Sequence, residues 1–308
     1  WQRLHDRREA WPAGSVPAGG LFLTAGADVQ KDRIEVDVWA WGHGLESWLV
    51  DHVVLDGGPG DAACWAGLDA LLSRTWESDS GKAMRILRLA IDTGFEAPAV
   101  YAWARRSGSS HVAPIKGVES FNRASPVTGP TYVDATSRGK RLRRGAKLWT
   151  VAGSTFKAET YRFLRLPRPS DEELEAGARY PAGTIHLPTW IDSEWCKQFV
   201  GEQLVTVRSK RGFSRLEWQK LRERNEALDC RVYARAAAWL IGADRWPPSH
   251  WADLEAEFGL RAEPLVVAAA QPADPAAASG ASTQPLQTRL ARSRRPQARR
   301  IRRSSWMA

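Results

Sequence analysis

The sequence predicts an α/β fold whose core is one mixed β-sheet, antiparallel in its first strands and parallel in its later ones, with helices on its faces. Two β-type segments in direct succession, followed by apolar segments of alternating strand and helix length, predict this sheet. A chain of 308 residues with 43% hydrophobic and 26% charged residues has the composition of a globular protein that buries a core.

The first strands form a predicted hairpin. Residues 21–29 are one apolar run, and residues 34–41 alternate with the period of two that a strand requires. The letters QKDR between them fit a tight polar turn, so these two strands are expected to pair antiparallel. Residues 47–55 fit a third strand.

Helices then alternate with strands. We expect a helix at 61–76, the fourth strand at 85–92, a helix at 97–106 and the fifth strand at 111–115. Strands joined through helices usually run parallel, so these additions extend the sheet in the parallel sense.

The later segments are less regular. Residues 117–146 are rich in Gly, Ser and Arg and have weak periodicity, which favours a loop, and residues 147–166 fit a strand followed by a helix. Residues 201–218 are expected to form a second hairpin that turns at Arg211 and Gly212. A strong helix is predicted at 225–241 and a short one at 251–258.

Composition divides the chain into three expected regions. Residues 1–20 end in WPAGSVPAGG, a Pro and Gly density that favours a linker from an upstream domain. Residues 21–245 carry the α/β pattern. Residues 246–308 are expected as an extension that is Arg-rich and largely disordered, because Ala, Pro, Ser and Arg dominate it.

The charge is concentrated at the end of the chain. The net charge is +9, and the segment 275–308 holds eight arginines and no acid, which leaves about +1 for everything before it. Such an arm fits an acidic partner such as nucleic acid, and it equally fits a flexible solubilising tail.

Cysteine usage and hydropathy exclude other classes. The three cysteines are widely spaced and form no cluster with the six histidines, which argues against a disulfide framework and a zinc site and favours a reducing compartment. No apolar run of about 18 residues exists, so no membrane span is expected.

Three aspartates are the candidate catalytic and metal-binding residues. Asp28 and Asp92 end the first and fourth strands, which can be neighbours in such a sheet. Asp229 continues the helix face that carries Val232 and Tyr233, so it is expected to pack on the sheet, where an acid must be paired or bind a metal. Close carboxylates repel unless a cation intervenes.

Oxygen donors of this kind suit Mg²⁺ or Mn²⁺, and two such ions can activate water and stabilise the leaving oxygen of a phosphodiester. Each acid also has a structural interpretation. Asp28 and Asp92 could each cap a turn, and Asp229 could pair with Arg231 or Arg235.

Two basic segments are candidates for contact with DNA phosphates. One follows the fifth strand and the other is the second hairpin, where Phe213 stands among the cations. The candidate DNA-binding residues are Lys116, Arg138, Lys140, Arg141, Arg143, Arg144, Arg208, Lys210 and Arg211. Both segments could also be solvated surface.

Together these features resemble the ribonuclease H-like nuclease fold. More closely, AGADVQKDRIEVDVWAWG, AIDTGF, HVAPIKG and NEALDCRVYARAAAWL resemble the nuclease domain of the lambda-like (GpA-type) phage terminase large subunit, over about residues 1–246. The resemblance implies an endonuclease that cuts concatemeric viral DNA during genome packaging, with two divalent metals held by Asp28, Asp92 and Asp229.

The resemblance also implies partners and a location. These are double-stranded DNA, a small terminase subunit, a capsid portal that the C-terminal tail could contact, no membrane, and the host cytoplasm. The family carries an N-terminal ATPase motor, but no GxxxxGK[ST] occurs here, so ATP hydrolysis by this chain is not expected. The alternatives are another ribonuclease H-like resolvase or transposase-type nuclease, and a non-catalytic module that binds DNA or the portal.

Overall fold

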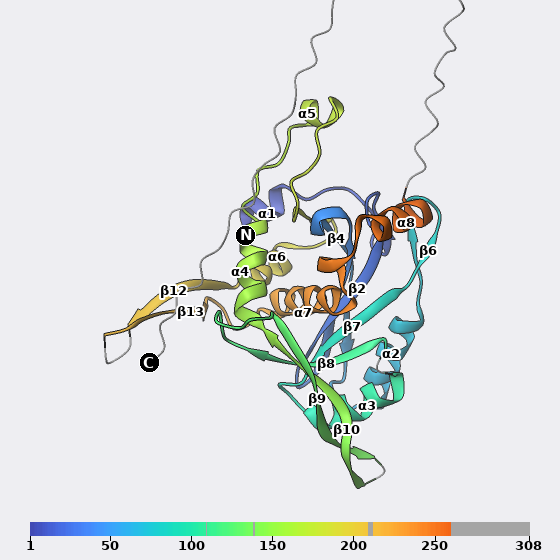
Figure 1. Cartoon of the computed structure of the whole chain (residues 1–308), viewed down its shortest axis with the longest axis vertical. Coiled ribbons are helices and arrows are strands. Elements are labelled where there is room, and N and C mark those ends of the chain that lie inside the picture. Colours follow the sequence, from blue (N-terminus) through green and yellow to red (C-terminus); the bar gives the residue numbers. More distant parts are fainter. Residues whose placement is uncertain (109, 138, 209–211, 260–308) are drawn as a thin grey trace, which may run out of the picture. The chain divides into compact units, whose positions relative to one another are not determined.

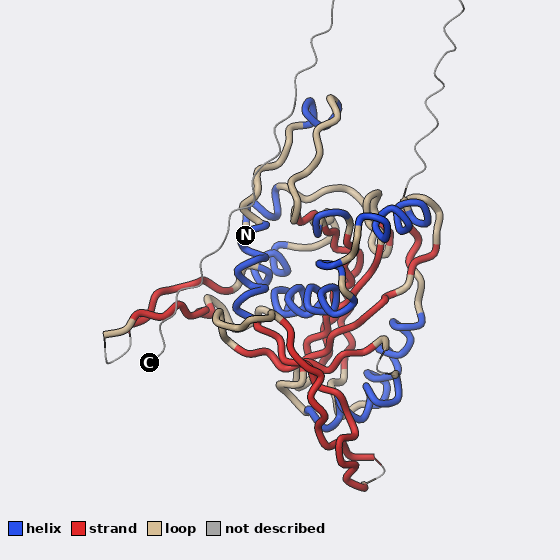
Figure 2. The backbone as a smooth tube through the Cα atoms, viewed as in Figure 1, coloured by secondary structure: helices blue, strands red, loops and turns tan. Residues whose placement is uncertain are grey.

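A computed structural model describes residues 1–108, 110–137, 139–208 and 212–259 (Figures 1 and 2). These residues belong to a unit that spans Trp1–Glu263. Three of the candidate DNA-binding residues, Arg138, Lys210 and Arg211, lie outside the described residues, as does the Arg-rich end of the chain.

The core of the fold is an eight-stranded mixed sheet with the order β11-β4-β3-β2-β7-β8-β10-β9. Strands β4, β3 and β2 pair antiparallel, whereas β2, β7, β8 and β10 run parallel to one another. This is the expected mixed sheet, with its antiparallel start and parallel additions. Its strands are β2 (Phe22–Val29), β3 (Arg33–Trp41), β4 (Ser47–Asp56), β7 (Ile86–Asp92), β8 (Val112–Val118), β9 (Val127–Ser137), β10 (Lys140–Ala152) and β11 (Ile185–His186).

Helices cover both faces of the sheet. Helices α2 (Ala62–Ser73) and α3 (Ala97–Ser107) pack on the face that carries Leu23 and Ala25 of β2. On the other face, α4 (Gly153–Phe163), α6 (Ser193–Phe199) and α7 (Glu226–Ile241) pack on side chains such as Trp39 and Ala90. The alternation of side chains along β2 therefore serves two buried layers, which explains its uninterrupted apolar run.

The basic segment 117–146 differs from its expectation. Most of it forms a long antiparallel pair of β9 and β10 instead of a loop. The described tip of this pair is exposed on both faces, so its sequence shows no apolar alternation that would reveal strands. Lys116 also lies within β8, which continues to Val118, rather than after the fifth strand.

Smaller elements complete the described chain. The second hairpin forms as expected, from β12 (Glu202–Arg208) and β13 (Ser214–Lys220). The segment expected as a linker holds α1 (Gln2–Asp6) and β1 (Ser15–Val16), and β1 pairs with β5 (Trp76–Ser78), so Trp76 belongs to a strand and not to the preceding helix. The remaining elements are β6 (Ala83–Met84), η1 (His43–Leu45), α5 (Asp171–Glu175), η2 (Ala243–Arg245) and α8 (Pro248–Phe258). No helix of the described residues is long and apolar enough to span a bilayer.

Candidate functional site

The ends of two adjacent parallel strands bring Asp28 and Asp92 together. Ala27 of β2 is in register with Ile91 of β7, so the next residue on each strand is one of these aspartates. Asp28 is the next-to-last residue of β2 and is 4% exposed, and Asp92 is the last residue of β7 and is half-buried. The expectation that the first and fourth strands are neighbours is confirmed by this pairing.

Helix α7 carries the third aspartate over the same face of the sheet. A Cβ atom at Gly26 would lie 1.9 Å from the carbonyl oxygen of Cys230 and 2.6 Å from the amide nitrogen of Ala234. Glycine at this position therefore allows the helix backbone to contact the strand directly. Asp229 precedes Cys230 by one residue, so the close approach positions its carboxylate near the strand ends.

Burial raises the pKa of all three carboxyl groups, and repulsion by neighbouring acids raises the pKa of Asp28 and Asp229 further. The pKa of Asp28 is raised well above its ordinary value by burial, then by the charges of Asp229 and Asp92. Burial raises the pKa of Asp229 to about 7, with Glu202 adding to the rise and Lys157 opposing it. Burial also raises the pKa of Asp92. Three interacting acids with raised pKa values are a costly arrangement in the absence of a cation.

Each of these carboxylates accepts a hydrogen bond from a neutral amide. Gln30 Nε2 donates to Asp28 Oδ2 at 2.6 Å, and the backbone N–H of Gly94 donates to Asp92 Oδ2 at 2.7 Å. Asn225 Nδ2 donates to Asp229 Oδ2 at 3.0 Å. The turn-capping interpretation is thus correct for Asp92, which closes a turn over residues 92–94.

The expected alternative partners of Asp229 bind elsewhere. Arg231 is buried between the rings of Trp39 and Trp41 and donates to Ser47 Oγ at 3.0 Å. Arg235 pairs with Glu159 and Asp244. Neither arginine neutralises Asp229.

A buried polar network that the sequence did not reveal surrounds Asp229. Asn225 Nδ2 also donates to Glu202 Oε1 at 2.8 Å, and Glu202 Oε2 accepts from Lys157 Nζ at 2.8 Å. Lys157 Nζ lies 3.2 Å from Glu119, and Lys220 Nζ donates to Asn225 Oδ1 at 2.6 Å. These residues come from distant elements and share no sequence motif. The one signal in the sequence is the position of Lys157 among the buried residues of α4, where a lysine needs a partner.

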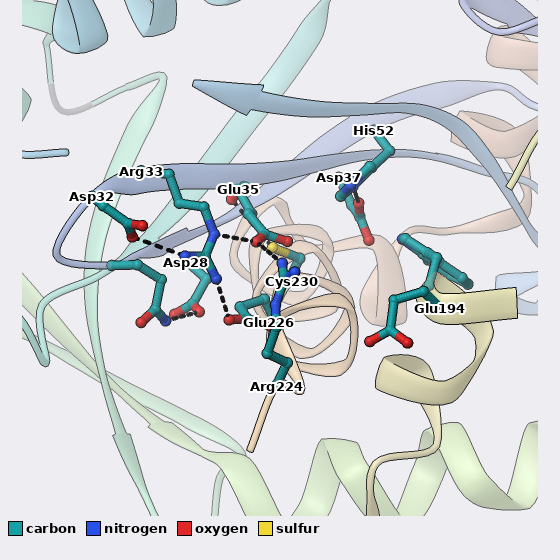
Figure 3. A network of polar contacts seen from close by, with 12 residues as sticks. Asp28, Asp32, Arg33, Glu35, Asp37, His52, Glu194, Arg224, Glu226 and Cys230 are labelled. Atoms are coloured by element: carbon teal, nitrogen blue, oxygen red, sulfur yellow. Dashed lines mark hydrogen bonds and ion pairs between the residues drawn. The ribbon is translucent and has the colours of Figure 1, made fainter. Parts of the chain in front are cut away.

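A second ionic network lies on the other side of Asp28 (Figure 3). Arg33 joins Asp32, Glu35 and Glu226, with its Nη2 2.6 Å from Glu226 Oε1. Glu35 Oε1 accepts from Arg33 Nε at 2.6 Å and from Arg224 Nη2 at 2.7 Å. Glu35 is opposite Asp28 in the β2–β3 register, so it adds a negative charge next to the site. Its two arginine partners neutralise this charge.

The described basic residues lie on exposed strand positions. Lys140, Arg141, Arg143 and Arg144 are exposed on β10, and Arg141 pairs with Asp134. Arg208 is the exposed last residue of β12. Lys116 follows Ile115, whose side chain packs with α7, so strand alternation places Lys116 on the opposite face of the sheet.

The donor set decides which ligand these acids fit. Among the described residues, no three His, Cys, Asp or Glu side chains are already closed into a metal site. The three aspartates nevertheless offer oxygen donors only, and a cation would reverse the repulsion that raises their pKa values. The set therefore fits a hard divalent cation, once the side chains converge on it.

The strand order and strand directions are those of a ribonuclease H-like domain, the fold class expected from the sequence. The family model described as "Terminase large subunit gpA, endonuclease domain" matches residues 1–251. The chain belongs to this family of terminase large subunit endonuclease domains.

Similar proteins agree with this assignment. The chain is 34% identical over 244 residues to the large terminase subunit of Escherichia phage lambda, covering 79% of the chain and 36% of that protein. It is 33% identical over 247 residues to the large terminase subunit of Enterobacteria phage P21, covering 80% and 36%. The chain thus spans about a third of the length of these relatives.

A solved structure is also similar. The large terminase nuclease from thermophilic phage G20c shares 14% identity and a TM-score of 0.33, covering 70% of this chain and 81% of that one. No residue correspondence follows from a similarity of this size.

Proposed function

We propose that this domain is a divalent-metal-dependent endonuclease that cuts double-stranded viral DNA during genome packaging, with Asp28, Asp92 and Asp229 as the metal ligands. The observation that supports the proposal most is that Asp28 and Asp92 stand at the ends of adjacent strands under α7, where the charges of Asp229 and Asp92 raise the pKa of Asp28. Membership of the terminase family disfavours the resolvase and transposase alternative.

The residues of the chain divide the work in this proposal. Asp28 and Asp92 would hold Mg²⁺ or Mn²⁺ from the strand ends, and Asp229 from the helix. Two such ions, when bound, supply an activated water and stabilise the leaving oxygen of a phosphodiester. Gln30, Gly94 and Asn225 orient the carboxylates through neutral N–H donors, which add no competing charge.

The β9–β10 pair is the proposed DNA-contacting arm. Its exposed cations suit phosphate contacts that do not depend on base sequence. A cavity of about 240 Å³ opens between this arm and α3, and its lining includes Arg105, Arg144, Tyr132 and Trp149. Guanidinium groups beside exposed aromatic surface fit a sugar-phosphate backbone with its bases. Arg208 and the adjoining residues of the second hairpin would extend this contact.

The resemblance to terminases extends the proposal to partners. A small terminase subunit is the proposed partner that would choose the cutting sequence, as the resemblance implies. The capsid portal is the second proposed partner, and the Arg-rich tail is the proposed element for it or for DNA.

Plasmid cleavage tests the proposed function. Supercoiled DNA is incubated with the 308-residue chain in Mn²⁺ or in EDTA, and the Asp92→Asn variant is compared with Asp253→Asn, which makes the same charge change at an exposed site on α8. We expect nicking that needs Mn²⁺, is lost in Asp92→Asn and is kept in Asp253→Asn. Nicking by Asp92→Asn would place the active centre elsewhere. DNA binding without any cleavage would favour the non-catalytic module.

A further inference from the structure

A cluster of arginines lines a cavity away from the three aspartates. The cavity has a volume of about 600 Å³ and lies between α1 and the segment that follows α4. Its lining residues are Arg3, Asp6, Arg7, Arg165, Leu166, Pro167 and Arg168. Two segments about 160 residues apart in the sequence thus contribute two arginines each.

Hydrogen bonds hold the inner two arginines in place. Arg7 Nη1 donates to the carbonyl oxygen of Leu164 at 3.1 Å, at the C-terminal end of α4. Arg168 Nη1 donates to the carbonyl oxygen of Arg7 at 2.8 Å, and Arg168 also pairs with Glu9. The cavity wall is therefore fixed by the fold and does not depend on mobile side chains alone.

The cluster holds more positive than negative charge. Glu9 neutralises Arg168, so Arg3, Arg7 and Arg165 face a single carboxylate, that of Asp6. In the described part of the chain, Nε and Nη2 of Arg7 are buried without an acceptor. Burial lowers the pKa of Arg7, and the charges of Arg168 and Arg3 lower it further. Like charges gathered in this way are stabilised by an anion.

The lining favours phosphate over other anions and over a whole nucleotide. Guanidinium groups bind phosphate oxygens through paired N–H donors, and several of them match a ligand with repeated charges. The apolar part of the lining is Leu166 and Pro167, with no aromatic ring on which a base could stack. The site is thus built for phosphates and not for bases.

We propose that Arg3, Arg7, Arg165 and Arg168 form a second phosphate-binding site, which takes the sugar-phosphate backbone of DNA outside the cleavage centre. The exposed Arg3 and Arg165 contact the phosphates, and Arg7 contributes its charge from below them. The choice of DNA as the source of the phosphates rests on the proposed nuclease function.

Helix α4 relates the two sites. Lys157, which belongs to the network around Asp229, lies in the middle of α4, and Arg165 follows its last turn. At about 1.5 Å per residue the two positions are about 12 Å apart along the helix axis. Each strand of duplex DNA carries a phosphate about every 3.4 Å along the helix axis, so about four base pairs span this distance. A single bound DNA is therefore long enough to reach both sites.

Salt-dependent DNA binding tests the proposal. Affinity for a short duplex is measured in EDTA across a range of salt concentrations, so that cleavage plays no part. The Arg3→Gln, Arg165→Gln double variant is compared with an Arg85→Gln, Arg106→Gln double variant. All four arginines are exposed, and their side chains have no hydrogen bond or ion pair in the described residues, so both variants lose the same charge without loss of a side-chain contact of this kind.

We expect the slope of log affinity against log salt concentration to fall by about 2 in the Arg3, Arg165 variant and to change little in the control. Equal slopes in the two variants would overturn the site. The source of the phosphate is tested by thermal shift with ATP. A rise in Tm of the wild-type chain with ATP that the Arg3, Arg165 variant lacks, together with an unchanged DNA slope, would assign the site to free nucleotides and overturn its DNA role.

This test is separate from the proposed cleavage. A slope that falls as expected while plasmid cleavage is absent would leave the phosphate site standing without the nuclease. Metal-dependent cleavage together with equal slopes in the two double variants would support the nuclease and overturn the phosphate site.

Discussion

Asn225 donates its side-chain amide to Asp229 Oδ2 at 3.0 Å, from the residue that precedes the first turn of α7. The same Nδ2 atom donates to Glu202 Oε1 at 2.8 Å, and Lys220 Nζ donates to Asn225 Oδ1 at 2.6 Å. The lysine thereby fixes which end of the amide faces the carboxylates. Asn225 is a positioning residue for the one proposed metal ligand that a helix supplies.

Replacing this amide by a carboxylate gives the first prediction. Asn225→Asp removes a donor and adds a negative charge beside Asp229, so it raises the pKa of Asp229 above about 7. We expect the midpoint of the pH–cleavage profile to move upward by about one unit or more and the Mn²⁺ requirement to rise. Gln219→Glu, the same change at an exposed position of β13, is the control. Identical profiles for the two variants would show that Asn225 does not position Asp229.

The raised pKa of Asp229 also predicts a pH-dependent stability. Its pKa is about 7 in the folded chain and about 3.9 in an unfolded one, so the folded state favours the protonated acid. This stabilisation is complete below about pH 4 and is lost as the pH rises through about 7. Urea denaturation without divalent cations should therefore give a lower free energy of unfolding at pH 8.5 than at pH 5.

Asp229→Asn isolates this contribution from those of other titrating groups. Between pH 5 and pH 8.5 we expect the unfolding free energy of the variant to fall less than that of the wild-type chain, by a difference of about 1 kcal/mol or more. The variant should then be the more stable protein at pH 8.5. Asp253→Asn should follow the wild type. A lower stability of Asp229→Asn at pH 8.5 would mean that its carboxylate is paired favourably in the absence of metal.

The contact between β2 and α7 makes Gly26 the most sensitive glycine near the site. In Gly26→Ala the new methyl group would meet the backbone of Cys230 at 1.9 Å, so the helix must move away from the strand. We expect a loss of about 1–3 kcal/mol in unfolding free energy together with loss of cleavage, because Asp229 moves with the helix. Gly60→Ala, where no atom lies within 4 Å, is the control. Full cleavage by Gly26→Ala would show that the helix position is unimportant.

The Arg-rich tail gives a prediction from the sequence alone. Deleting residues 275–308 removes eight arginines and no acid. We expect Mn²⁺ binding to be unchanged and the salt dependence of DNA affinity to decrease. The measurement is the same titration of a short duplex across salt concentrations. An unchanged slope would exclude the tail from DNA binding and favour its role toward another partner.

The sequence predicted those strands and helices whose apolar pattern follows directly from burial in the core. The strand that carries Asp28 is a buried apolar run, the strand that ends in Asp92 is buried over Leu89–Ile91, and the two strand ends are adjacent because β2 and β7 pair in parallel. The face of α7 that carries Val232 and Tyr233 was visible from helical spacing, since it packs on the sheet. The proposed ligands could therefore be selected before their positions were known.

The parts that the sequence did not predict depend on long-range contacts. Lys157, Glu202 and Asn225 come from α4, β12 and the start of α7, and nothing in their local sequence shows that they meet. The β9–β10 pair was also missed, because the described part of its tip is exposed and shows no apolar alternation. In both cases tertiary structure, rather than local pattern, determines the role of the residues.

Anomalous scattering from a crystal of the chain soaked in Mn²⁺ tests the metal-binding account most directly. The account predicts peaks at the strand ends, with oxygens of Asp28, Asp92 and Asp229 about 2.0–2.2 Å from the ions. Saturating Mn²⁺ that binds only elsewhere, with these three carboxylates pointing apart, would contradict it.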